Sequence, residues 1–310
     1  MKLCGVELAG PVLNGSGTFD AIAARRAFGD ALLERFPFDA FVSKTITLEP
    51  REGNPPPRLW EAPAGLINSI GLPNKGLEGF LSYDLPQLAE LPVPLVVSVM
   101  AYTPGDLAEL AARVAERDEV SLIELNVSCP NVESGLIMGS DPAETARAVG
   151  AARRRSQKPV IVKLTPNATD PAAVAAAAEG AGADAVSLLN TLKGMALDPL
   201  TRMPWLGGGS GGVSGPAVRA VALEQVASVS TRVGIPVVGM GGIASGADAA
   251  DFLAAGATVV AVGTESFRDP AAGTRIRREL APSQGHGHPD PGEGGAEASR
   301  VGAKTGAGTP

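Results

Sequence analysis

Eight short apolar segments recur along the chain, and their spacing limits the folds that it can adopt. They are PVLNGSG (11–17), FDAFVSKT (38–45), PLVVSVM (94–100), SLIELNVS (121–128), PVIVKLTP (159–166), DAVSLLNT (184–191), IPVVGMGG (235–242) and TVVAVGT (258–264). Continuous rather than alternating apolarity indicates strands that are buried on both faces, as in a parallel sheet. Helical patterns separate most of these segments, so the chain is predicted to form a (β/α)8 TIM barrel. An open doubly wound sheet is the alternative.

The helical patterns carry their own start signals. DPAETARAV (141–149) and DPAAVAAAAEGAGA (170–183) both open with aspartate at the N-cap and proline at the first helical position. Further helices are predicted at 105–117, 216–230 and 246–257.

Three regions interrupt this pattern. Residues 46–93 and 192–215 are long insertions, and long loops on a barrel are usually functional or disordered. Residues 281–310 are rich in glycine, proline and alanine and show no periodicity. We therefore expect a barrel domain over 1–280 and a disordered tail over 281–310.

Composition excludes several classes of protein. A net charge of −7 gives no indication of a nucleic-acid surface. The two cysteines, Cys4 and Cys129, form no disulfide framework, fit a reducing compartment and are too few for an iron–sulfur cluster. His286 and His288 both lie in the tail, so the folded part has no histidine base or metal ligand, and no metal site is predicted. With no apolar run of about 18 residues and no signal-peptide pattern, we expect a cytoplasmic protein without a membrane anchor.

Polar residues and glycines gather where the predicted strands end, which is where a TIM barrel places its active site. None of these residues is His, Asp or Glu, so neither a carboxylate dyad nor a histidine triad fits. The candidates are Ser16, Gly17, Lys44, Thr45, Ser98, Asn126, Cys129, Asn131, Lys163, Asn190, Thr191, Gly241, Gly242, Gly263 and Thr264, with Asn68 from the first insertion.

The glycines at the last two strand ends indicate a phosphorylated ligand. In barrels, the loops after strands 7 and 8 often bind phosphate through backbone N–H groups, and Gly241-Gly242 and Gly263-Thr264 occupy those loops. GMGGIA (239–244) also matches a dinucleotide-binding pattern, but too little chain follows it to complete a dinucleotide half-fold.

The remaining polar residues suggest what this ligand is. Amides offer donors and an acceptor side by side, which suits a planar ring with alternating N–H and C=O groups, such as a pyrimidine dione. Lys44 and Lys163 end their strands, where a charge is costly unless an anionic substrate or cofactor pairs with it. Cys129, between amides at a strand end, is either an inert core cysteine or a reactive thiol.

Seven motifs in series resemble the dihydroorotate dehydrogenase family, in the class with a catalytic cysteine. The resemblance covers roughly residues 1–275. The motifs are SKT (43–45), INSIGLPNKG (67–76), NVSCPN (126–131), VKLTPN (162–167), LLNTLKG (188–194), GGVSGPA (211–217) and GMGGI (239–243).

The resemblance implies a flavoenzyme that uses FMN to oxidise (S)-dihydroorotate to orotate in pyrimidine biosynthesis. It implies that Cys129 removes the C5 proton and that Lys163 stabilises the reduced flavin. The residues implied to bind substrate are Lys44, Asn68, Gly71, Leu72, Asn126, Asn131, Asn190 and Thr191. Those implied to bind FMN are Ser16, Gly17, Lys44, Thr45, Asn126, Lys163, Gly215, Gly241, Gly242, Gly263 and Thr264. One departure is Ser98, where many relatives carry asparagine.

The electron acceptor divides this class. One subclass is a homodimer that reduces fumarate, and the other pairs the catalytic chain with an FAD and iron–sulfur subunit that reduces NAD⁺, forming a heterotetramer. The NAD⁺ type is the prediction and the fumarate type its alternative. A dihydropyrimidine dehydrogenase-like reductase, a non-redox phosphate-binding barrel and a noncatalytic interaction protein are the rival interpretations.

Overall fold

The computed structural model describes residues 1–128 and 138–281, and an eight-stranded parallel sheet forms its centre. The strands lie in the order β3-β14-β13-β10-β9-β8-β7-β4. Their bounds are Val12–Asn14 (β3), Phe41–Val42 (β4), Leu95–Val99 (β7), Val120–Asn126 (β8), Val160–Lys163 (β9), Ala185–Leu188 (β10), Val237–Met240 (β13) and Val259–Val262 (β14). Each predicted apolar segment overlaps one of them, so the (β/α)8 TIM barrel is confirmed and the open sheet is wrong.

Both faces of the barrel strands are buried, which explains why their sequences do not alternate. One set of side chains fills the barrel interior, and it includes Val42, Val96, Leu122, Ile161, Ala185, Val238 and Val259. The other set packs outward in the large cluster that the helices cover. Apolar residues are therefore required at successive positions.

The barrel closes between β3 and β4, and the side chain of Asn14 bridges this seam. Asn14 is fully buried. Its Nδ2 donates to Val42 O at 2.8 Å and Gly15 O at 3.1 Å, while its Oδ1 accepts from Val42 N at 2.8 Å. Backbone pairing across the seam includes one isolated bridge, between Leu13 and Ala40. The amide thus takes the place of ladder hydrogen bonds that the short strands do not make.

Replacing Asn14 with alanine should destabilise the barrel. The change leaves the N–H and C=O of Val42 buried without this partner, at roughly 1–3 kcal/mol for each unpaired group. We expect the free energy of unfolding in urea to fall by about 2–4 kcal/mol. Asn167→Ala, which removes an exposed asparagine, should cost less. An equal loss in the two variants would contradict a special role for the seam.

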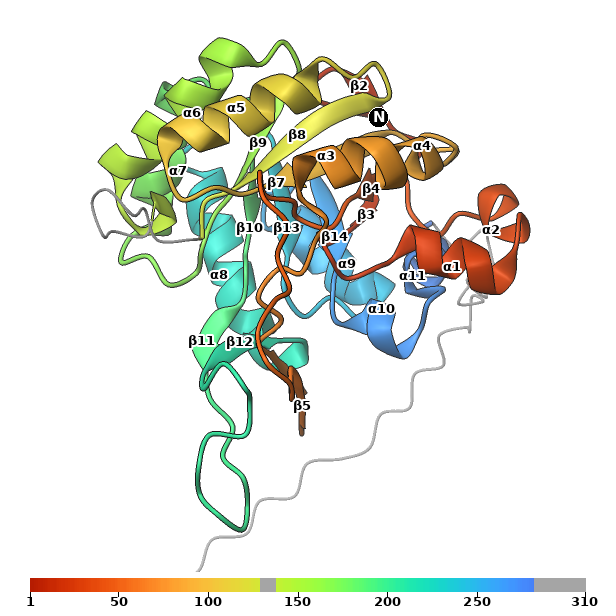
Figure 1. Cartoon of the computed structure of the whole chain (residues 1–310), viewed down its shortest axis with the longest axis vertical. Helices are drawn as coiled ribbons and strands as arrows, with labels where there is room; N and C mark the ends of the chain where they lie inside the picture. The colour runs from red at the N-terminus through yellow and green to blue at the C-terminus, as the bar shows by residue number, and fades with distance from the viewer. Residues whose placement is uncertain (129–137, 282–310) are drawn as a thin grey trace, which may run out of the picture.

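Helices follow the barrel strands and cover the outside of the sheet (Figure 1). The predicted N-caps are confirmed: Asp141 accepts from Glu144 N at 2.8 Å, and Asp170 accepts from Ala173 N at 2.9 Å. The five predicted helices correspond to α5 (Pro104–Ala115), α6 (Pro142–Arg155), α7 (Pro171–Gly180), α8 (Arg219–Ser230) and α9 (Gly246–Ala254). A 3₁₀ turn, η3 (Pro216–Val218), leads into α8, and α6 extends six residues past the predicted end at 149.

Several helices lack a sequence prediction. Most are single turns, too short for a 3.6-residue period to be recognised. They are α1 (Ala21–Phe28), α2 (Ala31–Glu34), α3 (Gly76–Gly79), the π-helix η1 (Phe80–Asp84), α4 (Leu85–Leu88), the 3₁₀ turn η2 (Met138–Ser140), α10 (Glu265–Arg268) and α11 (Ala272–Leu280). No helix within the two described ranges is long and apolar enough to cross a membrane.

Small antiparallel sheets cover the two ends of the barrel. The hairpin β1 (Lys2–Leu3) and β2 (Val6–Glu7) lies at the end from which the strands start, and its apolar side chains join the interior cluster. The two insertions, predicted to be functional or disordered loops, pair with each other over the opposite end. They form the sheet β11-β12-β6-β5 from Leu192–Gly194, Gly211–Ser214, Gly65–Asn68 and Leu59–Ala62. Figure 1 shows it at the end away from the N-terminus, with the β11–β12 connection extending beyond the barrel.

Candidate active site

A cavity of about 320 Å³ lies between the C-terminal ends of the barrel strands and this second sheet. Its size and mixed lining are typical of small-molecule sites. Of the residues predicted to bind substrate or cofactor, it brings together Ser16, Gly17, Lys44, Thr45, Asn68, Leu72, Asn126, Lys163, Asn190, Thr191, Gly215, Gly241, Gly242, Gly263 and Thr264. Residues more than 240 positions apart in the sequence thus share one cavity.

Among the described residues, the predicted Gly71 and Ser98 are not part of this lining. Cys129 and Asn131 lie outside the described residues. Gly71 sits beside the cavity with φ of +77°, and an added Cβ there would collide with Asn54. It precedes the lining residue Leu72, and its predicted contact with substrate stays a prediction.

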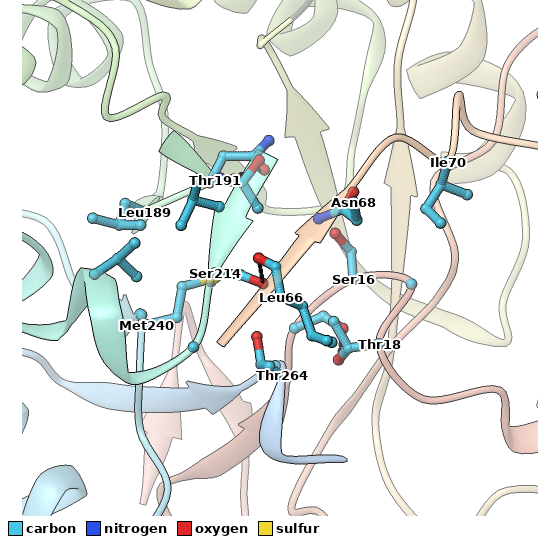
Figure 2. Close-up of a pocket in the computed structure, with 18 of the residues that line it drawn as sticks. Ser16, Thr18, Leu66, Asn68, Ile70, Leu189, Thr191, Ser214, Met240 and Thr264 are labelled. Carbon is cyan, nitrogen blue, oxygen red and sulfur yellow. Dashed lines mark hydrogen bonds between the residues drawn. The ribbon is translucent and has the colours of Figure 1, made fainter. Parts of the chain in front are cut away.

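Apart from Leu72, the apolar part of the lining has no counterpart in the sequence prediction. Leu59, Leu66 and Val213 come from the second sheet, and Leu189, Met240 and Phe267 come from the barrel side. Figure 2 shows Leu189 and Met240 on one side of the cavity and Asn68 and Ser16 on the other. These residues provide an apolar wall for a flat ring. The alternation in Gly212-Val213-Ser214 is a weak sequence signal for a strand. The strand that it pairs with, and which places Val213 at the cavity, lies 144 positions earlier in the chain.

Lys163 is the buried cation of the site. It ends β9, is 6% exposed, and its Nζ donates to Ser16 Oγ at 2.8 Å. No carboxylate within the described part of the chain lies within 4.0 Å of that ammonium group. A buried cation with a neutral partner is costly, so the cavity favours an anionic group on its ligand.

Lys44 differs from Lys163 in its environment. The sequence predicted that both lysines need an anionic partner, but Lys44 is exposed. Water can solvate its ammonium group, so the argument from the cost of burial holds for Lys163 and is wrong for Lys44.

Three asparagines keep hydrogen-bonding capacity free for a ligand. Asn68 Nδ2 donates to Gly212 O at 3.1 Å, Asn190 Nδ2 donates to Ser128 Oγ at 2.9 Å, and Asn126 Oδ1 accepts from Ser128 N at 3.2 Å. An amide can make up to four hydrogen bonds. Asn68 Oδ1 and Asn126 Nδ2 have no partner among the residues described, so the site presents both an acceptor and a donor.

The last two strand ends form a cradle of backbone N–H groups. Gly241 and Gly242 have φ of +131° and +79°, and added Cβ atoms would approach Ala222 Cβ to 2.6 Å and Gly215 O to 2.8 Å. Glycine is therefore required at both positions. In the described residues, no hydrogen-bond acceptor is recorded for the N–H groups of Gly241, Gly242, Gly263 and Thr264. Such free N–H groups fit a phosphate.

Together these features fit a phosphorylated flavin. The glycine cradle suits its phosphate, the apolar wall suits its ring system, and Lys163 suits the negative charge that the ring carries when reduced. Cys4 lies at the other end of the barrel from this cavity, where its Sγ donates to Asp184 O at 3.3 Å. Burial, with a smaller effect from Asp184, raises the pKa of Cys4 to about 12, so it stays a thiol.

Comparison with known proteins agrees with this geometry. The sequence profile described as Dihydroorotate dehydrogenase matches residues 1–283. A Pelobacter propionicus protein named "Dihydroorotate dehydrogenase B (NAD(+)), catalytic subunit" is 47% identical over 282 residues, covering 90% of this chain and 91% of its own. A Trichlorobacter lovleyi protein of the same name is 46% identical over 277 residues, covering 89% and 90%. A Solibacter usitatus protein, provisionally named dihydroorotate dehydrogenase A (fumarate), is 44% identical over 282 residues, covering 90% of each chain.

The profile matches nearly the whole described chain, and relatives well above 40% identity match along most of their own length. The chain therefore belongs to the dihydroorotate dehydrogenase family.

Proposed function

We propose that this chain is the FMN-binding catalytic subunit that oxidises (S)-dihydroorotate to orotate in pyrimidine biosynthesis. The observation that carries the proposal is the cavity in which Lys163, the free amide groups and the glycine cradle converge. Two relatives bear the name of an NAD⁺-linked catalytic subunit, which supports the same assignment.

Each group of site residues would have a separate role in binding or catalysis, according to its chemistry. Asn68, Asn126 and Asn190, with Asn131, would hold the pyrimidine ring through their amides. Cys129 would take the proton from C5 of the substrate. FMN, when bound, supplies the acceptor for the hydride from C6. The Lys163 ammonium would favour negative charge on the ring beside it, and the N–H groups of the glycine cradle would bind the phosphate.

The proposal extends to the electron acceptor. Two cysteines in the whole chain cannot ligate an iron–sulfur cluster of the four-thiolate kind. NAD⁺ reduction would thus need a partner subunit with FAD and an iron–sulfur cluster, assembled around a homodimer of this chain. The fumarate-reducing type is the second candidate, because a relative of similar identity carries that name. Residues 1–280 would form the catalytic domain, 281–310 a disordered tail, and the cytoplasm would be the site of action.

The absorbance of the purified chain, mixed anaerobically with dihydroorotate, tests the substrate. We expect the yellow flavin band to bleach. Dihydrouracil, which lacks the carboxylate, should not bleach it; bleaching by dihydrouracil alone would favour a dihydropyrimidine dehydrogenase-like reductase. A colourless protein that does not take up FMN would refute the proposal.

Reoxidation by fumarate or by NAD⁺ then tests the acceptor. The isolated chain should remain reduced with NAD⁺ and with fumarate, and NAD⁺ should reoxidise it once the partner subunit is added. Rapid reoxidation by fumarate alone would assign the chain to the fumarate type.

A further inference from the structure

A chain of buried hydrogen bonds runs from the cavity into the barrel interior. Thr45 Oγ1 lies 2.9 Å from Ser98 Oγ, and Ser98 Oγ donates to Glu124 Oε1 at 2.9 Å. Ser187 Oγ donates to the second carboxylate oxygen, Glu124 Oε2, at 3.3 Å. Ser98 and Ser187 are 0% exposed, and Thr45 and Glu124 are each 3% exposed. Of the four, Thr45 lines the cavity.

Ser98 itself does not line the cavity, although its strand end was predicted to reach the ligand. Its backbone N–H donates to Ser43 Oγ at 3.1 Å, and its hydroxyl is engaged by Thr45 and Glu124. Ser98 therefore does not reach the cavity itself. Its hydroxyl links Thr45 to Glu124 by hydrogen bonds.

The number of hydroxyl protons determines which group donates in each of these buried hydrogen bonds. An ionised carboxylate only accepts hydrogen bonds, and a serine hydroxyl has a single proton. Ser98 gives that proton to Glu124, so the contact with Thr45 requires Thr45 to be the donor. The one hydroxyl proton of Thr45 is then engaged by Ser98. Its lone pairs are what remain for the cavity.

We infer that Glu124 is a positioning residue that acts through Ser98 to make Thr45 an obligate hydrogen-bond acceptor for the bound cofactor. The group seated against Thr45 must then be a donor, a requirement that the ring N–H of a flavin meets. The inference rests on the proposed use of FMN.

The surroundings of Glu124 favour this role over that of an ion-pair partner. No cation of the described chain lies within 4.0 Å of its carboxylate, and the two serine hydroxyls are its hydrogen-bond donors. A buried carboxylate is costly unless donors satisfy it. Two apolar residues would fill this space at lower cost, so the arrangement is explained by what it does to Thr45.

A double-mutant cycle on FMN affinity, read by quenching of flavin fluorescence, tests the inference. In Glu124→Gln, the amide can either accept from Ser98 or donate to it, so the direction of the chain is no longer set. We expect FMN to bind about tenfold more weakly. In a Thr45→Val background, which lacks the hydroxyl, Glu124→Gln should change FMN affinity no further.

Ser98→Ala removes the hydrogen bonds that link Thr45 to Glu124 without altering the carboxylate, so it should weaken FMN binding as Glu124→Gln does. This second variant keeps the test decisive if Glu124→Gln misfolds. Ser156→Ala removes another buried serine hydroxyl, which donates to Lys158 O at 2.9 Å near the start of β9, and should leave FMN affinity unchanged. Equal losses from Glu124→Gln with and without the Thr45 hydroxyl, or no loss at all, would overturn the inference while leaving the proposed function intact. Failure of the wild-type chain to bind FMN would overturn both.

Discussion

Replacing Cys129 with serine should slow the reduction of bound FMN by dihydroorotate roughly 10²–10⁴-fold. Cys129 lies beyond the described residues, so this expectation comes from its place in NVSCPN (126–131) and from the chemistry of a thiol. A thiol with an ordinary pKa near ~8.5 ionises far more readily than a serine hydroxyl, and the thiolate is the base. FMN should stay bound, because the cradle and Lys163 are unchanged. Anaerobic stopped-flow absorbance at the flavin band measures the rate.

Cys4→Ser provides the matched control. Cys4 lies at the end of the barrel opposite the cavity, and burial raises its pKa to about 12, so it stays a neutral thiol. Flavin reduction should therefore proceed at the wild-type rate in this variant. A Cys129→Ser rate equal to that of the wild type would remove Cys129 from the role of base.

Replacing Lys163 with methionine should have two opposite effects. Reduced FMN should lose roughly 30-fold to 4,000-fold in affinity relative to oxidised FMN, equivalent to about 2–5 kcal/mol for loss of one partner of a buried charge pair. The FMN-free chain, in contrast, should become more stable, because methionine replaces a buried cation that has a neutral partner, Ser16 Oγ. The midpoint potential of the flavin reports the first effect and thermal unfolding of the FMN-free chain reports the second.

Lys193→Met is the comparison for both measurements. Lys193 is an exposed lysine in β11 that does not line the cavity. Its removal should change neither the potential nor the unfolding temperature appreciably. If Lys163→Met left the potential unchanged, the assignment of Lys163 to the reduced ring would be lost, even with the stabilisation of the FMN-free chain observed.

The barrel was predictable because its signals are local. Each strand is a continuous apolar run, and the starts of helices such as α6 and α7 are marked in the sequence by Asp-Pro at the N-cap and first helical position. Parallel strands of a TIM barrel end at one face. Residues as distant as Ser16 and Thr264 could therefore be assigned to one site without any knowledge of their contacts.

The cover over that site was not predictable, because it depends on pairing between distant segments. β6 and β12 lie 144 positions apart at the pair Asn68 and Gly212, and nothing local in either segment specifies the other. The same pairing supplies Leu66 and Val213 to the cavity wall. The role of Asn14 in closing the barrel could not be predicted from the sequence for the same reason, because its partner Val42 is 28 residues away.

The sequence by itself determined the barrel, the strand-end location of the site and the residue types gathered there, since periodicity and strand direction decide these. The tertiary structure alone decided which lysine is buried, which hydroxyl groups contact Glu124, and what covers the cavity. Lys44 and Lys163 both end a strand in the sequence. In the structure Lys44 is exposed, whereas Lys163 is buried, at 6% exposure, and donates to Ser16. Burial and hydrogen-bond partners are properties of the packed chain, because they depend on every element that surrounds a side chain.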